Sequence, residues 1–459
     1  MNMRSILPAL LCALSLANAA PLALHPDNPR YFIFHDKPAV LITSGEHYGA
    51  VLNLDFDYIK YLDTLAADGL NLTRTFSGTY IEPEGAFNIT QNTLAPKAGR
   101  FIAPWARTGP GGKFDLETWD DAYFARLRDF VAQAGRRGII VELTLFCPMY
   151  EEAQWKLSPM NAANNVNGTG AVGRNDVHTL DRSGGLLAVQ ESLVRKIVSE
   201  LRGAENLCYE ICNEPYFGGV TMPWQHRIAD VITDAEKDLA SKHLITQNIA
   251  NGSAKIERPH PAVSVFNFHY ANPPAAVALN AGLNKVIGDN ETGFKGTADA
   301  HYRMEAWEFI LAGGALYNNL DYSFTAGHED GTFQYPATQP GGGNAGFRRQ
   351  MKVLKEFIHA FDFVKMKPAR EMIREPLPGD ARWQVLAEPG RQYAAYFKGA
   401  PAFRFTLDLP AANYQMEWLD AVSGRKNPAE KLPHPGGAAS FQIPDGFSEC
   451  ALRLVRAAN

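Results

Sequence analysis

The sequence predicts an α/β fold: a (β/α)8 TIM barrel followed by a small all-β sandwich domain. Two patterns favour it. Between residues 39 and 361, short apolar runs alternate with amphipathic stretches, which is typical of parallel strands joined by helices with right-handed crossovers. After Pro368 the chain changes to short alternating runs separated by Pro and Gly, which is typical of an antiparallel sandwich.

Eight apolar runs are expected to form the barrel strands. They cover residues 39–43, 70–76, 139–146, 207–213, 244–248, 263–269, 285–291 and 315–322. The stretches expected to be helices cover residues 57–68, 119–137, 187–201, 224–241, 302–311 and 347–361. Eight such strands fit a closed barrel with loop insertions. A doubly wound sheet is the competitor, but its dinucleotide-binding form lacks support because no Gly-x-Gly-x-x-Gly follows the first strand.

The chain is expected to divide into three segments. Residues 1–19 read as a signal peptide, because Arg4 precedes an apolar run and the triplet Ala17-Asn18-Ala19 follows it. Residues 20–368 are the expected barrel and catalytic domain. Residues 369–459 are the expected accessory sandwich, which we interpret as a stabilising domain packed on the barrel in preference to an independent sugar-binding module. The protein is therefore predicted to be secreted or periplasmic.

Composition excludes several classes of protein. The 459 residues are 46% hydrophobic and carry a formal charge of −5, so a sizeable core is expected and a nucleic-acid partner is not. No later stretch reaches about 18 uninterrupted apolar residues, so no membrane span is expected. The four cysteines beyond residue 19 are too few for a disulfide scaffold. Cys147 and Cys212 are expected to be neighbours at the ends of adjacent strands, and their bonding is left open.

Strand parity predicts which side chains face the barrel interior. In the third and fourth strands, Glu142 and Glu210 alternate with apolar residues that pack on helices, so both carboxylates point inward. Buried charges must pair, and we interpret Glu142 and Glu210 as part of a structural ion-pair network. Arg74 in the second strand lies nearer the C-terminal end and is expected to face the functional site.

Two other glutamates close strands at the barrel mouth. Glu214 ends the fourth strand before Pro215, and Glu291 ends the seventh strand before Thr292-Gly293. Active sites of these barrels lie at the C-terminal ends of the strands. A pair of carboxylates can cleave a glycosidic bond, because one protonates the leaving oxygen while the other attacks the anomeric carbon.

The triplet Asn213-Glu214-Pro215 after strand four, together with a second glutamate ending strand seven, resembles clan A of the glycoside hydrolases and is most similar to family 5. The resemblance covers the barrel. It implies that Glu214 is the acid/base, that Glu291 is the nucleophile, and that the anomeric configuration is retained. It also implies that Asn213 binds the sugar 2-hydroxyl and that Arg74 orients the nucleophile.

The resemblance extends to the substrate-binding residues, with departures. Strand six ends in adjacent His269 and Tyr270, where family 5 has one residue between the His and the Tyr, and either residue here is expected to contact Glu291. The usual strand-eight tryptophan is absent, so Tyr322 or Phe324 is expected to supply the stacking face. His47, after strand one, is expected to contact substrate. The aromatic residues expected to stack on sugar rings from the loops after strands three and four are Trp155, Tyr216 and Trp224.

The leading hypothesis is therefore a secreted retaining glycosidase that cleaves β-glycosidic bonds of an oligo- or polysaccharide, with a carbohydrate as its only expected partner. The alternative is a catalytically idle carbohydrate-binding barrel, which the presence of both strand-end glutamates disfavours. A metal-dependent lyase would need a convergent set of ligands, and we expect neither a metal nor a cofactor. These motifs select no particular sugar, linkage, cleavage mode or oligomeric state.

Overall fold

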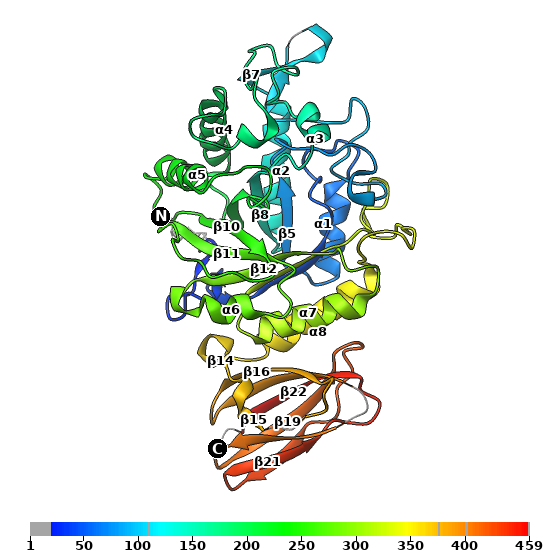
Figure 1. Cartoon of the computed structure of the whole chain (residues 1–459). Coiled ribbons are helices and arrows are strands. Elements are labelled where there is room, and N and C mark those ends of the chain that lie inside the picture. The colour runs from blue at the N-terminus through cyan, green and yellow to red at the C-terminus, as the bar shows by residue number, and fades with distance from the viewer. Residues whose placement is uncertain (1–19, 109, 375–376, 400–402, 458–459) are drawn as a thin grey trace, which may run out of the picture.

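The computed structural model describes residues 20–108, 110–374, 377–399 and 403–457. The expected signal peptide lies outside the described residues. Figure 1 shows a barrel with a β-sandwich packed against one of its sides. No helix in the described part of the chain combines the length and apolar character that a membrane crossing requires.

The predicted barrel is confirmed. Eight parallel strands form one sheet in which neighbours along the chain are neighbours in space, and the first strand, β4, also pairs with the last, β13. The strands are β4 (Leu41–Gly45), β5 (Leu72–Phe76), β8 (Ile140–Phe146), β9 (Leu207–Cys212), β10 (Leu244–Asn251), β11 (Val263–His269), β12 (Val286–Thr292) and β13 (Leu316–Leu320). Almost every residue in them is buried, as expected where side chains fill the barrel on one face and contact helices on the other.

A side chain completes the seam between β4 and β5. The Oδ1 atom of Asn71 accepts a hydrogen bond from the Ile42 N–H at 2.8 Å, and its Nδ2 donates to the Val40 carbonyl at 3.0 Å. The amide therefore takes the place of a neighbouring backbone unit where the two strands diverge.

Helices cover the outside of the barrel. They are α1 (Tyr58–Ala67), α2 (Asp121–Arg136), α3 (Glu152–Leu157), α4 (Leu186–Leu201), α5 (Met222–Ala235), α6 (Ala275–Leu279), α7 (Asp299–Leu311) and α8 (Ala345–His359). Side chains that accept backbone N–H bonds begin several of them, including Asp57 at α1 and Asp120 at α2. No helix joins β10 to β11, as the sequence indicates. Helix α5 begins and ends earlier than expected.

Small strands that the sequence did not predict flank the barrel. β1 (Ala23–Leu24), β2 (Phe32–Phe34) and β3 (Lys37–Ala39) form a separate antiparallel sheet, so Ala39 lies outside the first barrel strand. β6 (Trp105–Arg107) and β7 (Phe114–Trp119) pair within the insertion after β5. Short 3-10 turns lie at Ala86–Asn88, Pro110–Gly112, Arg174–Asp176, Ala281–Leu283, Phe363–Lys365 and Arg370–Met372.

The C-terminal module is the predicted antiparallel sandwich. One sheet runs in the order β14-β16-β17-β22-β19-β20 and faces a second sheet of order β15-β18-β21. The strands are β14 (Lys367–Pro368), β15 (Ile373–Arg374), β16 (Arg382–Glu388), β17 (Gln392–Lys398), β18 (Arg404–Leu409), β19 (Ala412–Asp420), β20 (Glu430–His434), β21 (Gly437–Gln442) and β22 (Glu449–Arg456). The Phe397 and Phe405 rings stack between the sheets with centroids 4.2 Å apart.

The sandwich docks on helix α7. The Arg303 guanidinium donates to both oxygens of Glu449, at 2.7 and 2.8 Å, and the Trp307 ring stacks on Tyr396 with centroids 5.3 Å apart. Residues Tyr302–Leu311 are all buried, because one side of α7 contacts the barrel and the other contacts β16 and β17. Figure 1 shows this helix between the two domains.

Candidate active site

A cavity of about 210 Å³ opens at the C-terminal ends of the barrel strands. Residues at or just after the ends of β4, β5, β8, β9, β10, β11 and β12 line it, together with Tyr80, Glu82, Phe87 and Leu94 from the insertion after β5. Both strand-end glutamates reach it, and Glu214 and Glu291 are only 8% and 5% exposed. This is the end of the barrel at which TIM-barrel enzymes place their chemistry.

Glu214 is held by three donors. The Tyr150 hydroxyl donates to its Oε2 at 2.6 Å, while the Tyr216 hydroxyl and His269 Nδ1 lie 3.1 and 3.2 Å from its Oε1. The backbone of Glu214 has φ +35°, in the left-handed region that non-glycine residues rarely adopt. Such strain is typical of functional sites, and here it turns the carboxylate into the cavity.

A β-bulge directs Glu291 toward the same point. Phe268 of β11 pairs with Asp289, but the next residue, His269, pairs with Glu291, so β12 contains one extra residue. Consequently Asn290 and Glu291 both point into the barrel, where strict alternation would separate them. Asn290 Nδ2 donates to Glu210 Oε1 at 2.7 Å.

Glu291 accepts hydrogen bonds on both oxygens. Tyr48 and Arg74 donate to Oε2 at 2.9 and 3.2 Å, and Tyr270 donates to Oε1 at 2.8 Å. Burial alone would raise the pKa of Glu291, but the charge of His269 and its hydrogen bond, the Arg74 cation and the Tyr270 hydroxyl outweigh burial. The pKa of Glu291 therefore lies well below its usual range, and the group is a carboxylate.

His269 lies between the two carboxylates. Its Nδ1 is 3.2 Å from Glu214 Oε1 and 3.4 Å from Glu291 Oε1. Burial opposes protonation, yet the adjacent carboxylates raise the pKa of His269 to about 10. One oxygen of each glutamate and a ring nitrogen of His269 all lie within 4.8 Å of one another. This spacing could hold a cation, but an imidazolium with Arg74 beside it already neutralises the pair.

Below the cavity lies the expected ion-pair network. Arg74 Nε donates to Glu210 Oε2 at 2.9 Å, and Glu142 accepts from Thr246 and Asn267 at 2.8 and 2.7 Å. Burial, followed by the neighbouring Glu210 charge, raises the pKa of Glu142 to about 7. Arg74 also donates from Nη2 to Asn213 Oδ1 at 2.7 Å, so one guanidinium joins the buried network to the cavity.

The structure brings most of the sequence-predicted site residues together. Arg74, Asn213, His269 and Tyr270 contact the two glutamates or one another, and His47 lines the cavity 3.5 Å from Glu82. Of the two candidates after β13, Tyr322 packs at the site, its ring 6.0 Å from the His47 ring. Phe324 instead packs against Tyr61 behind the strands.

Two aromatic predictions are wrong. Trp224 lies in the first turn of α5, fully buried, with its ring on Phe146 and its Nε1 donating to Gln190 at 2.9 Å. Its indole therefore faces the core between α4 and α5 and cannot contact a sugar. Trp155 is also buried and donates to the Val172 carbonyl at 3.0 Å. Tyr216, the third ring, does reach the site.

Sequence reasoning assigned no role to several residues of the cavity: Tyr48, Tyr150, Glu82, Asn251, Phe87 and Phe294. Tyr48 and Tyr150 follow β4 and β8 closely, so the strand-end rule that selected the glutamates could have found them. Cys147 also lines the cavity, and Cys147 and Cys212 are both free thiols.

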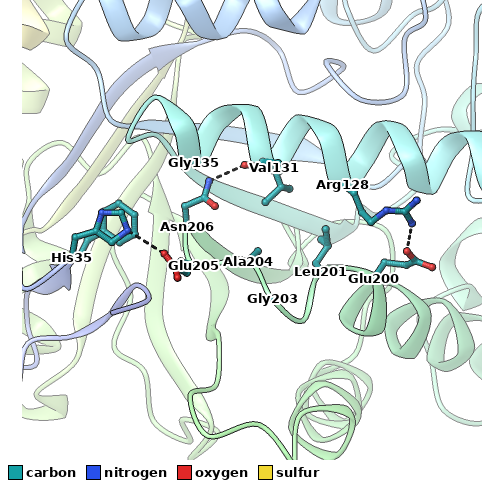
Figure 2. Close-up of a pocket in the computed structure, with 12 residues that line it drawn as sticks. His35, Arg128, Val131, Gly135, Glu200, Leu201, Gly203, Ala204, Glu205 and Asn206 are labelled. Carbon is teal, nitrogen blue, oxygen red and sulfur yellow. Dashed lines mark hydrogen bonds and ion pairs between the residues drawn. The ribbon is translucent and has the colours of Figure 1, made fainter. Parts of the chain in front are cut away.

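A second cavity, of about 340 Å³, lies where β9 begins, at the opposite end of the strands (Figure 2). Its charged groups pair with each other: Arg128 contacts Glu200, and His35 lies 3.4 Å from Glu205. Asn206 Nδ2 donates to the Val131 carbonyl at 3.1 Å. These polar groups satisfy one another and do not converge on the cavity.

Comparison with known proteins identifies solved structures that share this fold. No protein-family model and no curated protein sequence matches the chain. A solved glycoside hydrolase superposes with a TM-score of 0.67 at 14% identity, covering 96% of this chain and 98% of the other. A family 5 glycoside hydrolase from Bacteroides vulgatus gives 0.65 at 15% identity, covering 96% and 94%. A family 5 mannosidase from Rhizomucor miehei gives 0.51 at 10% identity, covering 74% and 99%. At these identities the likeness shows the fold, and the chain therefore shares the fold of barrel glycoside hydrolases that include members of family 5.

Proposed function

We propose that this protein is a retaining glycoside hydrolase that cleaves β-glycosidic bonds, with Glu214 as acid/base and Glu291 as nucleophile. The arrangement of Glu214, His269 and Glu291 within 4.8 Å carries the proposal. Retaining enzymes separate their two carboxyl groups by about 5 to 5.5 Å, whereas inverting enzymes need about 6.5 to 9.5 Å to admit a water molecule.

The environments of the two glutamates fit different roles. Arg74 and His269 keep Glu291 ionised, as attack on an anomeric carbon requires. Glu214 has no lysine or arginine partner within ion-pair distance among the described residues, and its nearest donors are tyrosines and His269. In the first step Glu291 bonds to the anomeric carbon while Glu214 protonates the departing oxygen. In the second step Glu214 takes a proton from the water that attacks the same carbon, so the configuration is retained.

Asn213 suits the recognition of a sugar hydroxyl beside the anomeric carbon. Its Oδ1 accepts from Arg74, and one hydrogen of Nδ2 goes to the Tyr150 hydroxyl at 2.8 Å. The second hydrogen of Nδ2 has only the Cys147 sulfur nearby, at 3.7 Å, which is a weak acceptor. A 2-hydroxyl group would accept this hydrogen without disturbing the contacts that orient the amide.

The test is a panel of aryl β-glycosides and β-linked polysaccharides, with β-mannosides included because one structural neighbour is a mannosidase. Product configuration is read by NMR before mutarotation. Glu291→Gln should abolish glycosyl transfer for every substrate. Glu214→Ala should strongly lower the hydrolysis rate of substrates with poor leaving groups. Added azide should restore the turnover of activated aryl glycosides by this variant, and the glycosyl azide formed should have retained configuration.

Glu205→Gln, in the opposite cavity, is the matched control and should leave all rates unchanged. A glycosyl azide of inverted configuration from Glu214→Ala would show that Glu214 is the nucleophile and Glu291 the acid/base. Full activity in Glu214→Ala or in Glu291→Gln would contradict the assignment of these two glutamates as the catalytic pair. Binding of a polysaccharide with no hydrolysis of any substrate would instead support an idle carbohydrate-binding barrel.

We also propose that the protein is exported. Support comes from the N-terminal charge, apolar run and small-residue triplet over residues 4–19. N-terminal sequencing of the mature protein should give a start near Ala20, and a soluble active form that retains residues 1–19 would contradict it.

A further inference from the structure

The insertion after β5 builds a fixed wall on one side of the cavity. The Glu82 N–H bonds to the Leu94 carbonyl at 2.8 Å, and the Thr93 hydroxyl lies 2.6 Å from Glu46 Oε2 in the loop after β4. Thr90 N–H donates to Gln339 Oε1, in the loop after β13, at 3.1 Å. The insertion also packs closely on the loop after β4, since a Cβ on Gly49 would lie 2.2 Å from the Thr93 carbonyl oxygen.

Glu82 faces the cavity from this wall, and His47 faces it from the adjoining loop after β4. They are 5% and 8% exposed, and both line the cavity. His47 Nε2 lies 3.5 Å from Glu82 Oε2, yet neither ring nitrogen of His47 has a partner in hydrogen-bonding geometry. Glu82 is held in turn by the hydroxyl of Tyr80 at 3.1 Å and by the amide of Asn92. A buried imidazole that borders a cavity and whose ring nitrogens make no well-aligned hydrogen bond indicates a ligand that supplies one.

The wall lies on the side of Glu291. His47 precedes Tyr48, whose hydroxyl bonds to Glu291, and the His47 and Tyr48 rings are 5.3 Å apart. On the side of Glu214, Tyr216 contacts the carboxylate and is 37% exposed, whereas Glu82 and His47 on the side of Glu291 are 5% and 8% exposed. In a retaining mechanism the attacked sugar sits over the nucleophile and the leaving group departs past the acid. The attacked sugar ring therefore lies beside Glu291 and the wall, and the remainder of the substrate extends past Glu214.

The size of the cavity fits one ring. Sites for drug-sized ligands occupy about 300 to 1,000 Å³, and this cavity has about 210 Å³.

We propose, on the basis of the proposed glycosidase function, that the enzyme is exo-acting and that Glu82 and His47 bind adjacent hydroxyl groups of the terminal non-reducing sugar. A neutral sugar is favoured because His47, Tyr80 and Asn92 already compensate the Glu82 carboxylate, which leaves no unpaired anion for an ammonium group.

Cleavage of a reducing-end-labelled hexasaccharide of the sugar preferred in the aryl glycoside panel tests the mode of action. The wild-type enzyme should release monosaccharide and shorten the labelled chain by one unit at a time. A 4,6-O-benzylidene aryl glycoside, blocked at the non-reducing end, should not be hydrolysed. Labelled di- and trisaccharides appearing first would overturn the exo assignment while leaving the glycosidase function intact. Absence of cleavage in every assay would instead reject the proposed function.

Variants of Glu82 test its assignment. Glu82→Ala should lower kcat/KM for the aryl glycoside about 10- to 100-fold, the usual range for a hydrogen bond to a charged group. The kcat/KM of wild type should fall at least tenfold with either the 3-deoxy or the 4-deoxy aryl glycoside, whichever lacks the hydroxyl that Glu82 binds. The same deoxy sugar should lower the kcat/KM of Glu82→Ala very little, because this variant has already lost the carboxylate that binds the hydroxyl. Glu82→Gln, which preserves shape, guards against misfolding and should give an intermediate loss.

Glu84→Gln is the matched control, since Glu84 lies exposed in the same insertion and outside the cavity. It should match wild type on every substrate. Equal discrimination against the deoxy sugars in wild type and in both Glu82 variants would overturn the assignment of Glu82. A preference of wild type for an aminodeoxy glycoside over its hydroxyl parent would overturn the neutral-sugar assignment.

Discussion

The Tyr150 hydroxyl donates a 2.6 Å hydrogen bond to Oε2 of Glu214. The hydroxyl is itself fixed by Asn213, which in turn is fixed by Arg74. Tyr150 therefore orients the proposed acid/base from a side chain that the barrel holds in place, whereas Tyr216 contacts the same carboxylate from an exposed loop.

Replacement of Tyr150 by Phe should slow substrates with poor leaving groups about 10- to 100-fold, because a hydrogen bond to a charged group contributes about 1.5 to 3 kcal/mol. Activated aryl glycosides should be affected less, since their departure needs little protonation. Steady-state rates across a series of leaving groups measure this. Tyr216→Phe should give the smaller loss at every leaving group, and equal losses would contradict the distinction.

The stability of the protein should depend on pH through His269. Its folded pKa of about 10 lies above the unfolded value of about 6.5, so its proton stabilises the native state fully below about pH 6.5. This contribution should disappear as pH rises toward 10. Urea unfolding of wild type and His269→Asn from pH 6 to 10 measures it, and the difference in unfolding free energy should shrink with pH. A constant difference would show that His269 is neutral in the folded protein.

Loss of the Arg74 charge should be costly. Arg74→Gln leaves Glu210 buried without its cation and Glu291 with His269 alone, and breaking a buried pair typically costs about 3 to 5 kcal/mol. Arg227→Ala removes the exposed ion pair with Glu191 and should cost at most about 1 kcal/mol. Denaturant midpoints at neutral pH compare the two, and similar midpoints would contradict the role of the network.

Trp224 and Phe294 should behave oppositely. Trp224→Phe removes the donor to Gln190 in the core and should destabilise the fold by about 1 to 3 kcal/mol with KM unchanged. Phe294→Ala removes a ring that is 37% exposed and lines the cavity, so KM should rise while stability stays within about 0.5 kcal/mol of wild type. Thermal unfolding and aryl glycoside kinetics on both variants check the contrast.

The sequence predicted the barrel well because its strands are buried on both faces and read as apolar runs. The strand-end position of Glu214 and Glu291 followed from those runs, and parity placed Glu142 and Glu210 inside. Arg74 was assigned to the site from its position near the C-terminal end of its strand. The bulge in β12 was beyond reach, because an inserted residue leaves no mark in hydrophobic periodicity. It is this bulge that brings Asn290 and Glu291 to the same side.

Loop and helix-start residues were predicted less well, for a physical reason. The ring of Trp224 was expected to stack on a sugar, but the Thr221 side chain caps α5 and places Trp224 in its first turn, facing the core. The contribution of Glu82 depends on contacts between the loops after β4, β5 and β13, which are distant in sequence. Most strands of the small flanking sheets are only two or three residues long, which is too short for any period to show.

Helix α7 contacts the barrel on one side and the sandwich on the other, and this arrangement has a consequence for folding during synthesis. All eight barrel strands are complete by Leu320, but the strands that cover the outer face of α7 begin only at Arg382. A nascent chain at the barrel stage therefore presents Trp307 and its apolar neighbours to water, a surface prone to aggregation or chaperone capture. The apolar outer face of α7 is therefore buried only after the sandwich strands have been synthesised.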